Sequence, residues 1–340
     1  MPYAILLGGT GVLGRTTALL LAADGWSVTV TGREPARMPA RLAAAGIRFV
    51  RSDRRDPAAL AAALGSGADL LVDALCFTAA DARSILPHLA GFAATVVFSS
   101  KAVYVDALGR HVNSPERPDF RGPVREDAPT LEPAWDALYQ SREGYGRNKV
   151  AAERVLLDSG HPVSVLRASK VHGIGSAAPR EWHFVRRVLE RRPAVLLAHE
   201  GRGFDHPAAA ANVAALVRTV ATHPGRRILN IADPDIPTGL DIARSVAARL
   251  GHEWEEVLVP GAEPGWHPWD AVPGMALDLA AARALGYRPA GTYAELIGPT
   301  LDWAASHGLT PPWLTEVDER EFDYAAEDAY LAELGRRGAS

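Results

Sequence analysis

The stretch YAILLGGTGVLGRTTALLLAAD, residues 3–24, joins an apolar strand to a helix through spaced glycines. Gly8 permits the tight turn, Gly11 lets the backbone approach a pyrophosphate, and Gly14 allows close packing of strand and helix. Phosphate oxygens would then meet the free N–H groups at the helix N-terminus. The stretch therefore predicts a dinucleotide site that also includes Thr10, Val12 and Leu13.

Further apolar runs follow at regular distances along the chain. They cover residues 26–32, 47–50, 69–75, 94–100 and 162–169, and Ala-rich helical patterns separate the strands from the first at 3–8 to that at 94–100. Buried strands alternating with helices of this length indicate a parallel sheet with helices on both faces. We predict an α/β fold with a Rossmann-type doubly wound sheet, whose ligands lie beyond the carboxyl ends of the strands.

Composition narrows the class of protein. The 340 residues carry a formal charge of −4, which is not the basic footprint of a nucleic-acid binder. A single cysteine, Cys76, cannot form an internal disulfide. The N-terminus lacks a charged leader segment, and no apolar run is long enough to span a membrane. We expect a cytoplasmic protein with a small-molecule substrate, no nucleic-acid partner and no membrane partner.

The alternation of strand and helix patterns changes along the chain and divides it into several segments. Residues 1–170 form the predicted dinucleotide-binding domain. A long excursion, residues 106–142, interrupts this domain; it is rich in Pro and Arg, and we expect it to lie over the mouth of the site. Residues 171–310 are predicted mainly as a smaller C-terminal substrate-binding lobe, with some segments returning to the Rossmann core. Residues 311–340 form an acidic C-terminal tail that ends in a predicted helix.

The end of the second strand bears on cofactor choice. NAD sites place an acid here for the ribose 2′-hydroxyl, whereas NADP sites use an arginine for the 2′-phosphate. The sequence Gly32-Arg33 offers a cation at this position, and the acidic residue Glu34 lies one residue beyond the place where an NAD site has its acid. We therefore expect Arg33 to favour NADP(H) over NAD(H).

Several motifs occur in a familiar order. They are GGTGVLG (8–14), SDRRD (52–56), VVFSSKAVY (96–104), YGRNK (145–149) and SVLRASKVHG (164–173). With them, the chain resembles the extended short-chain dehydrogenases/reductases, of the NAD-dependent epimerase/dehydratase type. The resemblance covers roughly residues 3–305 and implies an NAD(P)-dependent enzyme, with a homodimer as a further expectation.

The resemblance also implies residue roles. Tyr145 would be the proton donor and acceptor. Lys149 would hold the nicotinamide ribose and lower the pKa of the tyrosine. Ser100 would orient the substrate oxygen, and Asp53 would face the adenine. The remaining residues implied to line the cofactor are Ala74, Leu75, Cys76, Ser99 and Ala168.

Lysine is rare in this chain. Of 36 basic residues only Lys101, Lys149 and Lys170 are lysines, and all three fall on these motif segments. Lysine is a compact point charge that arginine does not replace. We hypothesise that Lys101 or Lys170 contacts an anionic group of the substrate or cofactor; the alternative is that both are charges at the rim.

The expected function is an NADP(H)-dependent oxidoreductase that reduces a ketone or oxidises a secondary alcohol, on a nucleotide-sugar or natural-product intermediate. One alternative is a nucleotide-sugar epimerase that retains its NAD(P). Another, from a different class, is a non-catalytic cofactor-sensing or RNA-binding protein. Dehydratases of the family place Asp-Glu where this chain has Lys101-Ala102, so dehydration is not expected.

The histidines lack the spacing of metal ligands, and no metal is expected. Trp182 and His183 are candidate residues of the substrate pocket.

Overall fold

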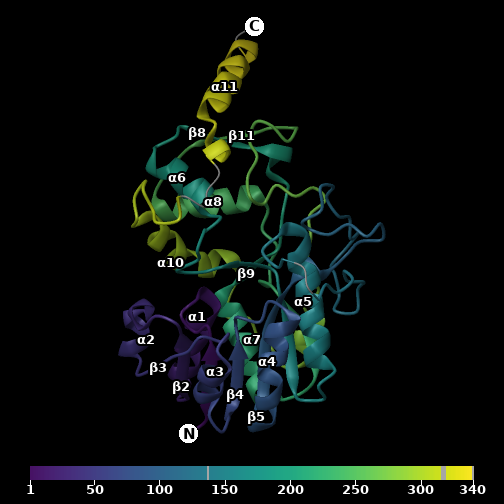
Figure 1. Cartoon of the computed structure of the whole chain (residues 1–340). Coiled ribbons are helices and arrows are strands. Elements are labelled where there is room, and N and C mark those ends of the chain that lie inside the picture. The colour runs from purple at the N-terminus through teal and green to yellow at the C-terminus, as the bar shows by residue number, and fades with distance from the viewer. Residues whose placement is uncertain (136–137, 315–318, 339–340) are drawn as a thin grey trace.

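Seven parallel strands form the central sheet of the residues described, 1–135, 138–314 and 319–338, in a computed structural model. Their order is β10-β6-β5-β4-β1-β2-β3, so the first strand lies inside the sheet (Figure 1). This arrangement confirms the predicted doubly wound α/β fold. The strands are β1 Tyr3–Leu7, β2 Ser27–Gly32, β3 Arg48–Arg51, β4 Ala68–Asp73, β5 Phe92–Ser100, β6 Val163–Ala168 and β10 Arg227–Ile231.

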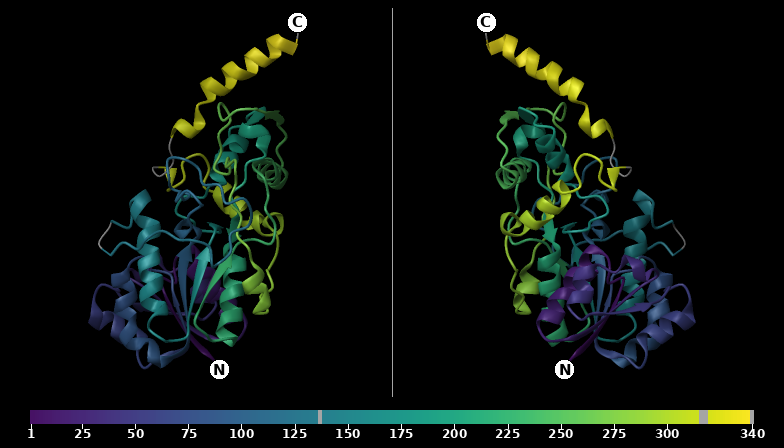
Figure 2. Two further views of the ribbon diagram at one scale, coloured as in Figure 1. Left: turned by 90° about the vertical axis from the view of Figure 1, so that its right-hand side faces the viewer. Right: turned by 90° about the vertical axis from the view of Figure 1, so that its left-hand side faces the viewer.

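Helices cover both faces of the sheet because the strands are apolar on both (Figure 2). Ala4 and Leu6 of β1 pack in the core beneath α1 and α7, and the alternate residues Ile5 and Leu7 pack beneath α3, α4 and α5. The helices are α1 Val12–Ala23, α2 Ala40–Ala44, α3 Pro57–Leu64, α4 Ala79–Ile85, α5 Arg142–Leu157, α7 Ala210–Thr222 and α9 Ala280–Ala284. Short 3₁₀ turns are η1 Pro35–Arg37, η2 Leu86–Gly91 and η3 Lys101–Val103.

A second core lies beyond the carboxyl ends of the strands (Figure 1). It is built around aromatic residues such as Trp182, Phe184 and Trp269, all essentially buried. The elements of this lobe are α6 Trp182–Leu189, β8 Ala194–Leu197, η4 Ala198–Gly201, α8 Gly239–Leu250, β11 Glu255–Leu258, α10 Tyr293–Ala305 and η6 Glu319–Phe322. Strands β8 and β11 pair in parallel. The lobe therefore lies over the edge of the sheet at which the parallel strands end.

The C-terminal helix α11, Tyr324–Gly338, extends away from the body (Figures 1 and 2). Its first turns are attached to the lobe by ion pairs from Arg187 to Glu327 and from Arg192 to Asp328. The helix expected in the tail is thus present.

Two segments show how distant parts of the chain meet. Pro207–Ala209 forms the short strand β9, which pairs with β7, Lys170–His172, and helix α7 begins only at Ala210. The partner strand lies far away in sequence, so local pattern could not reveal the pair.

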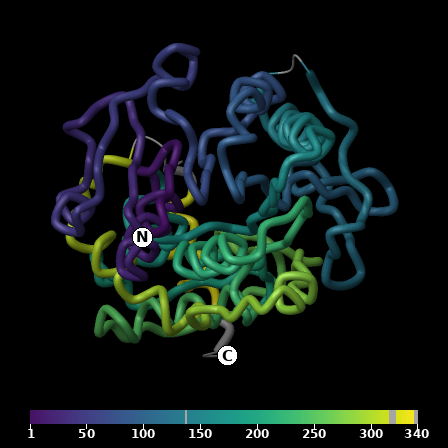
Figure 3. Tube along the Cα trace, turned by 90° about the horizontal axis from the view of Figure 1, so that it is seen from below, coloured from purple at the N-terminus to yellow at the C-terminus, as the bar shows by residue number. Residues whose placement is uncertain are grey.

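The excursion packs against the C-terminal lobe through a bridge from Val124 to Leu277. Asp106 organises its first half by accepting bonds from the N–H groups of Leu108, Arg110 and Asp119. Figure 3 shows the excursion and the first strands on opposite sides of the molecule.

Candidate active site

The glycine loop leaves no room for side chains at its closest approaches. A Cβ on Gly14 would lie 2.5 Å from the carbonyl oxygen of Gly8, and Gly8 has a φ of +76°, which L side chains rarely adopt. Gly11 is the N-cap of α1 and offers no side-chain cap to the helix. The first N–H groups of α1 are therefore open to an anionic ligand. Arg15 curls back over the loop, and its Nη2 donates to the carbonyl oxygen of Thr10 (2.8 Å).

The ends of β2 and β3 carry the residues expected at the adenosine. Arg33 directly follows β2 and is exposed. Its neighbour Arg37 forms an exposed ion pair with Glu34 (3.0 Å). Asp53 is exposed after β3, where its Oδ1 accepts a bond from the N–H of Arg55 (3.0 Å). Both predicted residues thus lie at the same edge of the sheet as the glycine loop.

The segment after β4 lies against the glycine loop. The N–H of Ala74 donates to the carbonyl of Leu7, and Leu75 Cγ would be 2.7 Å from a Cβ on Gly8. Cys76 is buried, and burial raises the pKa of its thiol. A buried thiol with a raised pKa carries little thiolate at neutral pH, so the polar groups that this segment offers to a ligand are those of its backbone.

Lys149 is held at the centre of this edge. Its Nζ donates to the carbonyl oxygens of Cys76 (2.7 Å) and Phe98 (2.8 Å), at the ends of β4 and β5. The same Nζ lies 5.9 Å from the ring centre of Tyr145, one turn earlier on α5, whose side chain is half-buried. The spacing of YGRNK thus places the ammonium and the phenol on one face of the helix.

Ser100 lies across from this pair. It ends β5 and caps the turn η3, accepting a bond from the N–H of Ala102 (3.1 Å). Helix α5 packs closely on that turn, since a Cβ on Gly146 would clash with the carbonyl oxygen of Ala102. Ser100, Tyr145 and Lys149 are therefore brought to one place. Ala168 stands beside Ser100 in the sheet register.

A buried ion pair that the sequence did not reveal supports this arrangement. Glu153, one turn after Lys149, accepts bonds from Arg167 (2.6 Å) and from the hydroxyl of Ser99 (2.5 Å). The Arg167 guanidinium lies 4.7 Å from the ring centre of Tyr104. Glu153 and Arg167 are only 4% and 3% exposed, so together they tie α5 to β5 and β6. The hydroxyl of Ser99 is directed to this pair.

The other two lysines meet at one carboxylate. Lys101 forms an ion pair with Asp205, and Lys170 Nζ lies 2.8 Å from the second oxygen of the same Asp205. Burial and the nearby Arg180 lower the pKa of Lys101 to about 7, and the same two causes lower that of Lys170. Neither Asp205 nor Arg180 carried a recognisable motif in the sequence.

A cavity of about 250 Å³ opens beside this cluster. The side chains that matter in its wall are Lys170, Arg180, Trp182, His183, Trp266 and Glu321. Both pocket candidates from α6 therefore contribute. We call it the lobe cavity.

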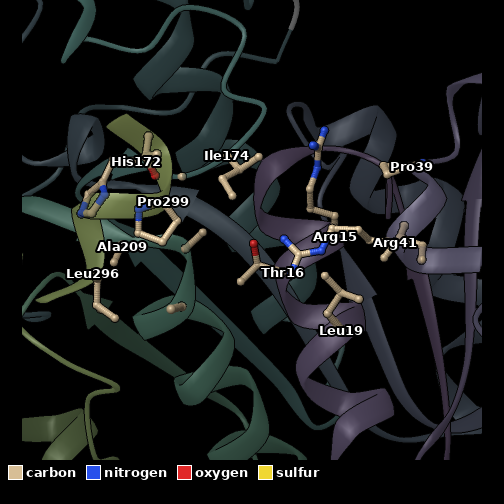
Figure 4. A pocket seen from close by; sticks show the side chains of 15 residues that line it. Arg15, Thr16, Leu19, Pro39, Arg41, His172, Ile174, Ala209, Leu296 and Pro299 are labelled. Atoms are coloured by element: carbon tan, nitrogen blue, oxygen red, sulfur yellow. The ribbon is translucent and has the colours of Figure 1, made fainter. Parts of the chain in front are cut away.

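A second cavity, of about 300 Å³, lies between α1 and α10 (Figure 4). Arg15, Thr16 and Leu19 approach it from α1, and Leu296 and Pro299 from α10, so its wall is largely apolar. Ser100, Tyr145 and Lys149 do not line it. This cavity is separate from the catalytic candidates.

Histidines in the described ranges serve packing and hydrogen bonding. His172 bonds the carboxylate of Asp233 (2.9 Å), and His206 bonds the carbonyl of the same residue (2.8 Å). Among the residues described, His, Cys, Asp and Glu side chains form no group of three or more that could hold a metal ion. Nor does any helix in those ranges combine the length and apolar character needed to cross a membrane.

The sequence and the fold are similar to those of known proteins. A family model described as "NAD dependent epimerase/dehydratase family" matches residues 4–232. Curated proteins yield no match. Among solved structures, a UDP-glucose-4-epimerase from Stenotrophomonas maltophila with bound NAD is 16% identical with a TM-score of 0.68, over 90% of this chain and 98% of that one.

Two further structures share this architecture. MoeE5 in complex with UDP-glucose and NAD is 19% identical with a TM-score of 0.65, covering 89% of this chain and 98% of that one. A UDP-glucose 4-epimerase from Thermus thermophilus in complex with NAD is 19% identical with a TM-score of 0.62, covering 91% and 100%. At these identities the likeness shows a common fold.

Proposed function

Because the chain belongs to the NAD dependent epimerase/dehydratase family, whose model spans residues 4–232, we propose that it oxidises a secondary alcohol or reduces the corresponding ketone. The observation that carries the proposal is the position of Lys149. Its ammonium is fixed by carbonyls at the ends of β4 and β5, beside Tyr145 and across from Ser100. A proton-transferring phenol beside a fixed cation suits this chemistry.

The cofactor site fits an NAD(P) dinucleotide. Gly8 and Gly14 allow the turn, Leu75 and α1 to pack closely, a Cβ on Gly11 would meet no atom nearer than 3.6 Å, and no side chain caps the N-terminus of α1 at Gly11. The first turn of α1 would hold the pyrophosphate, Asp53 the adenosine side, and the segment 74–76 with Lys149 the nicotinamide side. The dinucleotide supplies the hydride acceptor or donor.

The chain's own groups move the proton. In the oxidising direction the Tyr145 phenolate accepts the proton of the substrate hydroxyl, and the Ser100 hydroxyl orients that oxygen. In the reducing direction Tyr145 returns the proton to the carbonyl oxygen. Lys149 stabilises the phenolate by its charge.

We favour the epimerase form of this chemistry, in which one carbon is oxidised and then reduced again by a retained cofactor. Its support is that the similar solved structures carry the names of UDP-sugar epimerases, several of them with NAD. Net oxidation or reduction is the second candidate. Bound cofactor in the purified protein, with no net change in free NAD(P)H during turnover, supports the epimerase; stoichiometric NAD(P)H consumption supports the reductase.

Replacing Tyr145 by Phe tests the shared step. The variant should lose turnover of UDP-glucose or another nucleotide sugar by about 100-fold or more, because it cannot transfer the proton, and should keep its cofactor affinity. Turnover is followed by product analysis and cofactor affinity by nicotinamide fluorescence. A variant that keeps full turnover would remove Tyr145 from the chemistry.

We further propose that Arg33 favours NADPH through the 2′-phosphate. Arg33→Ala should weaken NADPH binding about tenfold and leave NADH unchanged. Arg37→Ala is the matched control, because Arg37 is already paired with Glu34. Equal losses for both cofactors would contradict the assignment.

The expected homodimer, through helices flanking the site such as α4 and α5, can be measured by light scattering.

A further inference from the structure

The cavity between α1 and α10 lies outside the expected cofactor site (Figure 4). Arg15, Thr16 and Leu19 line it from α1, whereas Ala18 and Leu21 of the same helix are buried in the core beneath. Among the described residues, none that is proposed to hold the dinucleotide lines this cavity. A ligand here would therefore leave the cofactor site free. We call this space the α1 cavity.

Apolar side chains form most of the wall of the α1 cavity. Leu19, Leu42 and Ile174 approach it from α1, α2 and the loop after β7, and Leu296 and Pro299 approach it from α10. Its volume of about 300 Å³ lies at the lower end of the range for small-molecule sites. The space therefore suits a short aliphatic chain or a single ring.

Two guanidinium groups give the α1 cavity a positive charge. Arg15 is half-buried, and its Nε (3.2 Å) and Nη2 (2.8 Å) both donate to the carbonyl oxygen of Thr10. Its Nη1 is left without a hydrogen-bond partner in the part of the chain that the structure describes. Arg41 is exposed on α2, and no ion pair of either arginine occurs among the described residues. Both guanidiniums are therefore available to an anion.

The helices around the α1 cavity supply no carboxylate to these arginines. Helices α1, α2 and α7 contain no acidic residue, and no acidic side chain in the described ranges lines the cavity. Helix α10 carries two carboxylates, and both have other partners. Glu295 accepts bonds from the N–H (2.7 Å) and the hydroxyl (2.9 Å) of Thr292, and Asp302 pairs with Arg249.

The other carboxylates close to this wall are also paired. Asp233 is fully buried and binds Nε2 of His172, a lining residue, at 2.9 Å. It also accepts a bond from the side-chain amide of Asn212 (2.8 Å). Glu34, ahead of α2, pairs with Arg37 (3.0 Å). Within the described part of the chain, the two guanidiniums at the cavity are therefore uncompensated.

A bound anion would stabilise this arrangement. Burial lowers the pKa of the Arg15 guanidinium, which shows that its charge is only partly solvated. Charge-assisted bonds from a guanidinium to a planar carboxylate are stronger than bonds between neutral groups. A single negative charge also costs less to place beside apolar side chains than the double charge of a phosphate. The α1 cavity therefore favours a carboxylate with an apolar body.

We propose that the α1 cavity is a binding site for a small apolar carboxylate. The carboxylate binds Arg15 and Arg41, and the apolar body lies against Leu19, Ile174 and Leu296. The ligand binds at the same time as the cofactor, and its binding does not depend on the reaction that the enzyme catalyses.

Isoleucine methyl groups provide a direct test. The chain has nine isoleucines, and Ile174 is the one among them that lines the α1 cavity as the structure describes it. Protein labelled with ¹³C at the isoleucine δ1-methyl groups is used, and Ile174→Val assigns the signal of interest. The probe is octanoate, added to the full chain saturated with NADPH. Octanol carries a similar chain without the charge, and acetate carries the charge without the chain.

We expect octanoate to shift the Ile174 signal saturably and to leave the signal of Ile236, which is exposed elsewhere, unchanged. Octanol and acetate should each bind about tenfold more weakly than octanoate or worse, because each lacks one of the two kinds of contact. The affinity for octanoate should be the same with and without NADPH.

Substitutions at the two arginines test the role of charge. Arg15→Gln should weaken octanoate binding about tenfold, and Arg41→Gln about threefold, because the exposed guanidinium is better solvated. The matched control is Arg218→Gln on α7, which removes an exposed guanidinium paired with Asp24 (3.7 Å) away from the cavity and should change nothing. The thermal midpoint of each variant establishes that it is folded.

The proposal is overturned if octanoate does not shift the Ile174 signal saturably, if octanol binds as tightly as octanoate, or if neither arginine variant weakens octanoate. Displacement of octanoate by NADPH would assign the cavity to the cofactor. A shift of the Ile174 signal that follows protein concentration alone would assign it to a second copy of the chain. Either result also overturns the proposal. Turnover in Tyr145→Phe has no bearing on these outcomes, so this proposal and the proposed function can fail separately.

Discussion

Two alanine substitutions in the glycine loop should separate its packing role from its ligand role. A Cβ at Gly14 would lie 2.5 Å from the carbonyl oxygen of Gly8 and 2.6 Å from Cα of Gly9, both backbone atoms that cannot rotate away. We expect Gly14→Ala to lower the free energy of unfolding by about 1–3 kcal/mol, the usual cost of overpacking.

Gly11→Ala should behave differently. Its Cβ would meet no atom closer than 3.6 Å, and the φ of Gly11 is −73°, which alanine adopts freely. Its free energy of unfolding should change by less than about 0.5 kcal/mol. The added methyl would nevertheless stand where the pyrophosphate is expected, so NAD(P) affinity should fall about tenfold or more.

The assay combines urea unfolding without cofactor and fluorescence titration with NADPH and NADH. Gly14→Ala should lose stability and affinity together, and Gly11→Ala affinity alone. If Gly11→Ala binds both cofactors as tightly as the unchanged protein, the pyrophosphate does not pass over this residue. If Gly14→Ala is fully stable, the close contact of strand and helix does not constrain the fold.

Three further predictions concern stability. Glu153→Gln leaves the Arg167 guanidinium buried without its carboxylate and should cost about 3–5 kcal/mol in urea unfolding, whereas Glu153→Leu with Arg167→Met should recover most of the loss; equal losses would contradict this. Burial lowers the pKa of His206 to about 4 and that of His267 to about 3, so the unfolded chain binds protons that the folded chain does not. Stability should be complete above pH ~6.5 and fall toward pH ~4 by about 1.4 kcal/mol per pH unit for each imidazole, and a flat profile of unfolding free energy would refute it. Thr238→Ala removes the capping box of α8 and should cost about 1 kcal/mol in thermal unfolding, with rescue by Ser; an unchanged midpoint would exclude a role for the cap.

Local patterns predicted the sheet because each strand carries its own signal. The apolar runs that became β1, β2, β4, β5 and β6 are buried on both faces, so their burial could be read from composition, whereas the shorter β3 at the edge of the sheet is only half-buried. Strands β7 and β9 could not be predicted, because three residues such as Pro207–Ala209 have no periodicity. Their pairing depends on where the lobe places them.

The residues of the candidate site also fall into those that local sequence spacing could predict and those that it could not. Gly8, Gly11 and Gly14 lie within one turn and Tyr145 and Lys149 within one helix, so their spacing predicts that they lie close together, while the role of the Tyr145–Lys149 pair came from the resemblance of several motifs in order. Asp205 meets two lysines from different strand ends, and Glu153 meets Arg167 from a neighbouring strand. Side chains that are joined only by the tertiary fold leave no spacing signal in the sequence.

The position of β10 has a consequence for synthesis on the ribosome. This strand forms the edge beside β6, yet it is translated about sixty residues after β6 ends, because part of the lobe is encoded between them. At about 5–20 residues per second, the edge of β6 stays unpaired for roughly 3–12 s. An open strand edge invites pairing with other chains. Nascent chains that stall before residue 231 should therefore aggregate, whereas chains released after it can close their sheet.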